Sequence, residues 1–406
     1  MRRCCDWNEK YYNFKLKNVL NKSFNIKMFE YQKTNRFFAQ VAAGLEQLGV
    51  EELTAISVQS IQPAIRGIYF ESDRAMLYRI NYTSRYLTRI LAPLTSFSCY
   101  DTDSLYEVAK AINWADLFSI DQTFAIFANV AHSKITHSQY AALRLKDAIV
   151  DYFRENFGKR PSIEKINPDV WINLHIENDE ATISLDTSGG SLHRRGYRKS
   201  TVEAPMQETV AAAIVRYTEW DGVKPIYDPM CGSGTLLSEA LMAYSNIPAG
   251  YLRKKFGFEL LPDFDSALWQ TVKQIEDGKI RNLPDRLISG SDISTKAIDA
   301  ARTNFQCLPD GNKIKLTVTD FREITNLNDC VILCNPPYGI RLGDKINLGQ
   351  FYKSLGNFLK QRCQGSTAFI YFGNREMLKY IGLKPSWKKP LENGGLDGRL
   401  AKFEIY

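Results

Sequence analysis

The chain has 406 residues, of which 44% are hydrophobic and 24% charged, which is typical of globular protein and long enough for two or three domains. It contains no uncharged apolar run of the roughly 18–20 residues that a membrane helix needs, and its first residues lack the apolar segment of a secretory signal. We therefore expect a soluble, cytoplasmic protein without a membrane partner.

The formal net charge is +7, but most of the excess lies at the start of the chain. Residues 1–27 hold seven Lys or Arg against two acidic residues, which leaves an excess of only +2 for the rest. Basicity alone therefore does not indicate nucleic-acid binding. Because Met28 precedes a well-patterned segment, we interpret residues 1–28 as a basic extension, which is either a flexible tail or an upstream mis-start.

The eight cysteines form no CxxC pair, and the four histidines do not cluster with them. The spacing of a zinc site is thus absent, and we expect reduced thiols and no bound metal. Cys330 and Cys334 bracket an apolar run, which favours small buried side chains over metal ligands.

The first half of the chain alternates helix-like and strand-like patterns. Residues 41–53 are amphipathic, residues 55–72 alternate apolar and polar side chains, and residues 74–91 repeat apolar side chains at helical spacing. Further elements are predicted as helices over 104–113 and 138–157 and strands over 123–131, 170–178 and 180–188. We expect two α+β modules, residues 29–69 and 70–187.

The second half, residues 188–406, follows a different pattern, in which strands and helices alternate. Strands are predicted over 225–228, 287–294, 313–320, 330–337 and 366–373, and helices over 205–218, 235–245, 297–305 and 350–362. This order indicates an α/β domain with a parallel, doubly wound, Rossmann-like sheet. Residues 245–286 are longer than one connection needs and are interpreted as an insertion.

A turn rich in small residues follows the strand that ends at Asp228. The candidate cofactor-binding residues of this turn are Asp228, Pro229, Cys231, Gly232, Ser233, Gly234 and Thr235. Its glycines let the backbone approach a ligand, but Leu237 replaces the third glycine of the dinucleotide fingerprint. Asp228 would repel a pyrophosphate and can accept a hydrogen bond from a cationic amino group, so the turn favours S-adenosylmethionine.

Two more acids stand at strand ends. Asp292, followed by Ile293, lies 58 residues beyond Gly234 and is suited to grip the two hydroxyls of a ribose. An alternative role for Asp292 is to cap the helix that follows. We expect Asp320 to accept a hydrogen bond from an adenine amino group, with Phe321 available to stack on the ring.

The strongest signal is the catalytic candidate Asn335-Pro336-Pro337-Tyr338 at the end of an apolar strand. The prolines remove two N–H donors, so nearby carbonyls can face the site as acceptors. An aromatic amine would donate its two N–H bonds to the Asn335 side-chain oxygen and a loop carbonyl, while its ring stacks on Tyr338. With both N–H bonds fixed, the nitrogen lone pair can point at a methyl donor, which is catalysis by positioning.

Together, these motifs resemble the amino-methyltransferases with an NPPY-type motif, which act on adenine, guanine, cytosine or glutamine amines. The segments SLHRRGYR (191–198), APMQETVAAAIV (204–215) and NGGLDGRL (393–400) narrow the resemblance to the bacterial THUMP-containing guanine-N2 methyltransferases of large-subunit ribosomal RNA. The resemblance implies a ferredoxin-like and THUMP region before the methyltransferase domain. It also implies that the glycine turn, Asp292, Asp320 and Asn335 bind S-adenosylmethionine and that the NPPY stretch holds the base.

The resemblance favours RNA binding over a solvated surface for the basic residues of the THUMP-like region. The candidates that could contact RNA phosphates there are Lys134, Arg144, Lys146, Arg154, Lys159 and Arg160. Near the domain junction, Arg195 and Arg198 could either contact phosphate or brace the two domains. We interpret His193 as structural, because the amine mechanism needs no general base.

We therefore predict a monomeric methyltransferase that modifies guanine N2 in structured, ribosomal RNA, with the base extruded from its stack. Three alternatives remain at this point: a transfer-RNA guanine-N2 enzyme, a DNA adenine-N6 methylase, and an RNA-folding or ribosome-assembly factor with a vestigial cofactor site.

Overall fold

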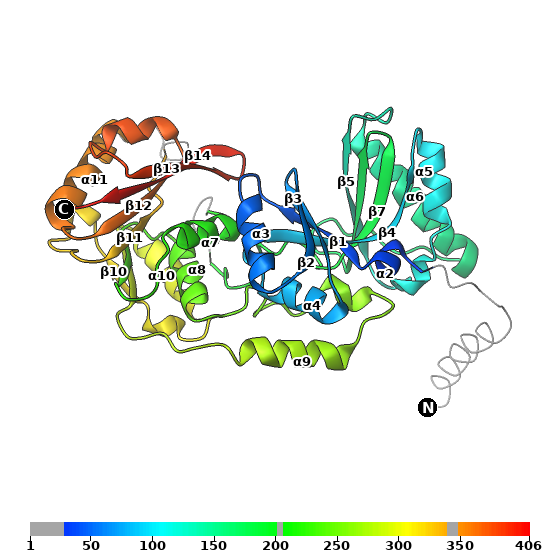
Figure 1. Cartoon of the computed structure of the whole chain (residues 1–406), viewed down its shortest axis with the longest axis horizontal. Helices are drawn as coiled ribbons and strands as arrows, with labels where there is room; N and C mark the ends of the chain where they lie inside the picture. Colours follow the sequence, from blue (N-terminus) through cyan, green and yellow to red (C-terminus); the bar gives the residue numbers. More distant parts are fainter. Residues whose placement is uncertain (1–27, 201–205, 339–347) are drawn as a thin grey trace.

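The computed structural model describes residues 28–200, 206–338 and 348–406, and it contains two seven-stranded sheets. Figure 1 shows the second sheet toward one end of an elongated molecule and residues 87–186 of the first sheet toward the other, with residues 36–71 of the first sheet between them. The predicted basic extension lies almost wholly outside the described residues. In the described ranges, no helix is long and apolar enough to cross a membrane.

The first sheet has the strand order β2-β3-β1-β4-β7-β6-β5. Its strands are β1 Arg36–Val41, β2 Gln59–Ala64, β3 Gly67–Glu71, β4 Leu87–Ser98, β5 Phe124–Ala131, β6 Val170–Glu177 and β7 Glu180–Asp186. Only the β5–β6 pair is parallel. The region's α-helices are α2 Glu30–Thr34, α3 Glu46–Ala55, α4 Arg74–Thr83, α5 Thr102–Lys110 and α6 Ser138–Phe157, with a 3-10 turn over Trp114–Asp116. The predicted α+β region is confirmed.

The long strand β4 makes the two predicted modules one sheet. Residues 87–91 of this strand pair with β1, and residues 91–98 pair with β7. The module boundary expected between residues 69 and 70 falls inside β3, where the sheet does not break. The helix predicted over residues 74–91 is wrong beyond Thr83, because pairing with neighbours on both sides holds the following residues extended.

The second sheet has the order β10-β9-β8-β11-β12-β14-β13. Its strands are β8 Ile226–Asp228, β9 Ile288–Asp292, β10 Lys315–Val318, β11 Val331–Cys334, β12 Thr367–Phe372, β13 Trp387–Asn393 and β14 Leu396–Glu404. The accompanying α-helices are α7 Glu208–Tyr217, α8 Thr235–Tyr244, α9 Ser266–Asp277, α10 Thr295–Phe305 and α11 Leu348–Arg362. Short 3-10 helices cover Gly257–Leu260, Gly311–Lys313, Phe321–Glu323 and Arg375–Tyr380.

The strands β8 to β12 are parallel, which confirms the predicted α/β core. The expectation of a wholly parallel sheet is wrong, because β14 runs antiparallel to both β12 and β13. Residues 387–404 form a hairpin whose connection is too short for a parallel crossover. The domain is therefore mixed, with the hairpin at one edge.

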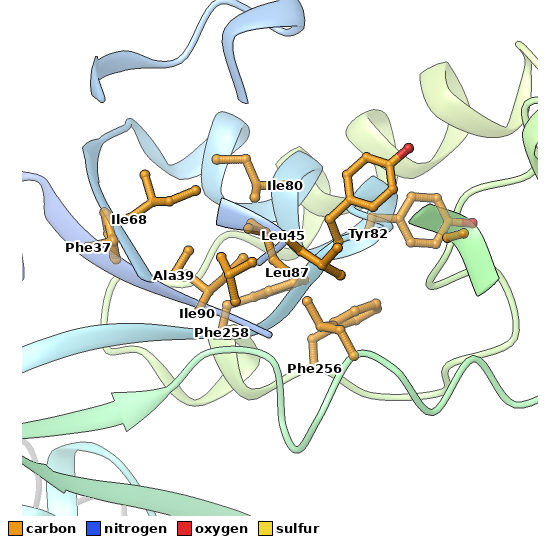
Figure 2. Close-up of a cluster of buried hydrophobic side chains, with 14 of the residues drawn as sticks. Phe37, Ala39, Leu45, Ile68, Ile80, Tyr82, Leu87, Ile90, Phe256 and Phe258 are labelled. Carbon is orange, nitrogen blue, oxygen red and sulfur yellow. The ribbon is translucent and has the colours of Figure 1, made fainter. Parts of the chain in front are cut away.

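The predicted insertion, residues 245–286, folds against the first region and not over its own sheet. Its helix α9 lies along α4 (Figure 1). Tyr82 of α4 meets the rings of Phe256 and Trp269 edge-on, and Figure 2 shows Tyr82 beside Phe256 and Phe258 in one buried cluster. The backbone N–H of Phe258 also donates to the Thr187 carbonyl at 2.7 Å. The insertion thus ties the two domains together.

A buried ion pair lies at the same junction. The side chains of Arg195 and Glu239 have no exposed surface, and their N–O distance is 3.4 Å. Arg195 also donates to the backbone carbonyls of Leu192 and Arg85, while the Tyr197 hydroxyl donates to Glu239 at 3.0 Å. Because Glu239 belongs to α8 and Arg85 precedes β4, this network fixes α8 against the first region.

We predict that Glu239→Gln lowers the free energy of unfolding by about 3–5 kcal/mol, because it leaves the buried Arg195 without the opposite charge of Glu239. Equilibrium unfolding in urea measures the change. The matched control is Glu51→Gln, which removes the exposed contact between Glu51 and Arg216 at 3.7 Å and should cost about 1 kcal/mol or less. Equal, small effects of both substitutions would show that the junction does not depend on this pair.

Candidate cofactor and substrate site

The predicted site residues meet at the carboxyl ends of the parallel strands. Strand β8 lies between β9 and β11, so the ends marked by Asp228, Asp292 and Asn335 are neighbours. Asp320 follows β10 on the far side of β9. Ligands of open α/β sheets bind outside this edge, where the strand order reverses. The structure therefore brings together the cofactor and catalytic candidates that lie far apart in the sequence.

The glycine turn connects β8 to α8. Gly232 and Gly234 have φ angles of 54° and 83°, in the left-handed region that favours glycine. A Cβ atom at Gly234 would lie 2.6 Å from the ring of Phe305. The residue before α8 must therefore lack a side chain for the helix to begin in this position. The Gly232 N–H donates to Asp292 at 2.9 Å, which joins the turn to the end of β9.

Asp228 is buried, with 1% of its surface exposed. One of its carboxylate oxygens accepts a hydrogen bond from the backbone of Met230 at 3.0 Å. Burial, together with the nearby charge of Asp292, raises the pKa of Asp228 to about 8. A cationic group bound beside this carboxyl would favour its charged form and lower the pKa again.

Asp292 holds the backbone of the site. Besides Gly232, it accepts a hydrogen bond from the N–H of Ser294 at 2.9 Å. The N-cap of α10 is Ser294, whose hydroxyl accepts from Ala297, so the alternative role of Asp292 as the helix cap is not what the structure shows. Ile293 is 66% exposed, which leaves its apolar side chain available to a ligand at this edge.

Asp320 lies beyond the end of β10 as expected, whereas Phe321 is placed differently from expectation. The Asp320 carboxylate forms an ion pair with Arg322, and this contact lowers the pKa of Asp320. Phe321 is buried and meets the rings of Phe351 and Phe358 at their edges. The expected stacking of Phe321 on a ligand ring is incompatible with this packing, because the side chain belongs to the core beneath α11.

Asn335 follows β11 and supplies an unused acceptor. Its side-chain oxygen is buried and has no hydrogen-bond partner among the described residues. A buried acceptor without a partner costs about 1–3 kcal/mol, so this oxygen is available to accept a hydrogen bond from a ligand. The neighbouring carbonyl of Pro337 accepts a hydrogen bond from the buried Tyr352 hydroxyl at 3.3 Å, which holds the proline loop in place. Pro336 lies between Asn335 and Pro337.

Tyr338 is almost buried, with 8% of its surface exposed. Its ring lies against the backbone of Gly373, the residue that follows β12. A Cβ atom at Gly373 would lie 2.6–2.9 Å from the nearest ring atoms, closer than side chains tolerate. Gly373 therefore sets the position of the ring that is expected to stack on a base.

Asn304 was not predicted from the sequence, yet it braces the glycine turn. It is buried within α10, and its side-chain N–H groups donate to the carbonyls of Ser233 and Ser200 at 3.0 and 2.8 Å. Its oxygen accepts from the N–H groups of Lys199 and Ser200. The only sequence signal is an amide among the apolar positions of a predicted helix.

The predicted RNA-binding residues of the first region separate into two groups. Arg144, Lys146, Arg154 and Arg160 line one groove of about 670 Å³ beside α6, whereas Lys134 and Lys159 do not line it. The groove also contains four carboxylates, from Asp103, Glu107, Asp147 and Asp151. Arg144 pairs with Asp103 at 2.8 Å and Lys146 with Asp147 at 2.7 Å. The groove is electrically balanced, so it attracts phosphate weakly.

The two junction arginines differ in what they contact. Arg195 cannot contact RNA phosphate in this fold, because its side chain has no exposed surface and is paired with Glu239. Arg198 is partly exposed and donates to the Thr235 hydroxyl at 3.2 Å, at the start of α8. Of the two roles left open from the sequence, the structure supports the bracing role for Arg195, whereas the contacts of Arg198 with Met206, Glu208 and Thr235 all lie within residues 188–406. Among the described residues, no group of three or more His, Cys, Asp or Glu could hold a metal ion.

Comparison with protein families gives three matches in the expected order. Residues 36–91 match the RlmL ferredoxin-like domain, residues 99–186 match the THUMP domain, and residues 195–402 match the RMKL-like methyltransferase domain. The first match ends within β4, the strand that the two parts of the first sheet share, and the second begins directly after this strand.

Individual proteins agree with these matches. A Synechocystis sp. protein named "Putative RNA methyltransferase slr0064" is 40% identical over 92% of this chain and 97% of its own length. Ribosomal RNA large subunit methyltransferase K/L of Syntrophotalea carbinolica is 38% identical over 91% of this chain, which spans only 53% of that relative. The solved structure of "a putative methyltransferase complexed with SAH" has a TM-score of 0.78 at 28% identity and covers 92% of this chain and 98% of its own.

The family matches and the identities agree with the strand-end motifs and the two-sheet fold. This chain belongs to the RMKL-like methyltransferase family, in which ferredoxin-like and THUMP domains precede the methyltransferase domain.

Proposed function

We propose that this chain transfers a methyl group from S-adenosylmethionine to the exocyclic N2 of a guanine in large-subunit ribosomal RNA. The observation that carries the proposal is the buried, unpartnered oxygen of Asn335 at the sheet edge, next to the glycine turn. The membership of the chain in the methyltransferase family supports methyl transfer. The name of the Syntrophotalea carbinolica relative supports ribosomal RNA as substrate. Since the chain spans about half of that relative, the proposal concerns this half only.

The residues at the carboxyl ends of the parallel strands fit S-adenosylmethionine, which supplies an electrophilic methyl group when bound. Asp228 can accept a hydrogen bond from the ammonium of its amino acid part, and Asp292 from the ribose hydroxyls. The turn through Gly232 and Gly234 lets the ligand approach the backbone. The exposed side chain of Ile293 offers apolar contact to the adenine ring.

On the substrate side, the protein orients an amine and supplies no strong base. The Asn335 oxygen and a carbonyl of the proline loop accept the two N–H bonds, and Tyr338 offers its ring to the base. Holding both hydrogens directs the nitrogen lone pair toward the methyl donor. These contacts suit any base amine. Guanine is proposed because of the resemblance carried by SLHRRGYR and NGGLDGRL.

The direct test is nucleoside-resolved mass spectrometry of ribosomal and transfer RNA from a strain lacking the gene. N2-methylguanine should disappear from one large-subunit position, and expression of the wild-type chain, but not of Asn335→Ala, should restore it. Loss confined to transfer RNA, loss of a methylated adenine from DNA, or full restoration by Asn335→Ala would each refute the proposal.

We predict that Gly373→Ala lowers kcat for RNA methylation by roughly 100-fold, because its Cβ displaces the Tyr338 ring by about 1 Å. Affinity for S-adenosylmethionine, measured by calorimetry, should stay within twofold of the wild type. That unchanged affinity also shows that the variant is folded. Wild-type kcat in Gly373→Ala would show that Tyr338 does not position the base.

We predict that binding of S-adenosylmethionine releases a proton near pH 7. In the free protein the pKa of Asp228 is about 8, so its carboxyl is mostly protonated at that pH, and a bound cation favours the charged form. Affinity should therefore rise with pH up to about 8 and level off above it. Calorimetry in buffers of different ionisation enthalpy counts the proton. Asp228→Asn should bind more weakly and release none, and an unchanged proton count would contradict this role of Asp228.

A further inference from the structure

We propose that a single-stranded stretch of the substrate RNA binds in the cleft between the polar face of the first sheet and the tip of the β13–β14 hairpin. This inference rests on the proposed function for the nature of the occupant. The cleft has a volume of about 700 Å³ and is lined by residues of both domains. The cleft is separate from the groove beside α6 and from the cofactor and substrate site at the carboxyl ends of the parallel strands.

The floor of the cleft is a polar sheet face. The strand register places Ser96, Thr182, His175 and Asn129 side by side across β4, β7, β6 and β5. All four line the cleft, and Asn173 lies in the next row. The opposite face of β6 carries the fully buried Ile172, Leu174 and Ile176. One face of the sheet therefore holds the core, and the other presents hydrogen-bonding groups to the cleft.

These groups suit the edges of unpaired bases. Asn129 carries both donors and an acceptor, and the two ring nitrogens of His175 add further hydrogen-bonding positions. The Ser96 and Thr182 hydroxyls lie 3.1 Å apart, and each can rotate to suit a partner. Sequence-specific proteins read single-stranded RNA by hydrogen bonds to base edges and by stacking on aromatic rings. Phe38 and Tyr69, whose ring centroids are 4.8 Å apart, supply aromatic surface in the same cleft.

The charges at the cleft also favour bases over bulk phosphate. Arg36 and Arg66 line it together with Glu30 and Glu392, so the cations and carboxylates balance. Arg66 on the β2–β3 turn reaches Glu392 on β13 at 3.7 Å, which links the two walls across the domains. With only two arginines to contact phosphates, binding should depend weakly on salt.

The hairpin wall leads to the catalytic edge. In the β12–β14 register, Phe372 at the end of β12 pairs with Arg399. The hairpin tip at Gly394 and Gly395 therefore projects beyond the same strand ends that carry Asn335, and Gly373 beneath Tyr338 lies at this edge. Figure 1 shows β13 and β14 reaching from the second sheet toward β3 and β1. RNA held on the cleft floor is thus directed toward the base site.

The test uses the full chain, a short fluorescent single-stranded oligoribonucleotide of mixed sequence and its duplex with the complement. The floor variant is Asn129→Ala/His175→Ala, which changes surface side chains. The control is Arg154→Ala/Arg160→Ala in the α6 groove, which removes two cations. Fluorescence anisotropy should show at least tenfold weaker single-strand binding for the floor variant and a change within twofold for the control. The duplex should bind the wild type more weakly than the single strand does.

Two further measurements distinguish this inference from the proposed function. With ribosomal RNA as substrate, the floor variant should raise KM at least tenfold and leave kcat and the affinity for S-adenosylmethionine unchanged. Ultraviolet crosslinks should map to β5 and β6. If the wild-type chain methylates RNA but the floor variant keeps its KM, or if crosslinks map to the α6 groove, the cleft inference is overturned. Floor-dependent oligonucleotide binding without any methyl transfer would support the cleft and refute the proposed function.

Discussion

The arrangement of the site depends on the contact between Arg195 and Glu239. Glu239 lies in α8, the helix that begins at the glycine turn, and Arg195 donates a hydrogen bond to the backbone carbonyl of Arg85, just before β4 of the first sheet. Neither side chain is exposed, so the two charges are stabilised only by each other and by the surrounding hydrogen bonds. Such a pair allows few alternative geometries. It therefore fixes where the turn lies relative to the ferredoxin-like and THUMP domains, and the insertion through α9 reinforces this placement.

The strand-end site keeps polar groups in desolvated positions. Asp228 is buried beside a second carboxylate, and the Asn335 oxygen has no partner among the described residues. Each arrangement costs folding free energy, which the two cores offset elsewhere. A ligand that supplies a cation to Asp228 or an N–H to Asn335 recovers that cost. The unfavourable environment of these two groups would thus contribute to binding and orienting the reactants.

The net charge of each surface of the first region differs from what the spacing of the basic residues along the sequence suggests. The helix α6 carries several basic side chains, but carboxylates from α5 and from α6 itself neutralise the groove beside it. The polar face of the sheet carries little net charge, yet it presents side chains that can read bases and opens toward the second domain. Counting Lys and Arg along a helix therefore overestimates the positive charge of the surface beside it, because the count leaves out the carboxylates that line the same groove.

The sequence by itself determined the parallel core, the glycine turn and the NPPY loop, because each depends on residues that are adjacent in the chain. It also predicted α6 with its observed bounds, Ser138–Phe157, from periodicity alone. Tertiary structure decided that residues 87–98 form a strand, that residues 245–286 pack against the first region, and that Phe321 lies in the core. It likewise decided that Arg195 and Asn304 brace the site. In these cases the contacting residues lie far apart in the sequence. The local sequence pattern therefore does not show which contact selects the observed conformation.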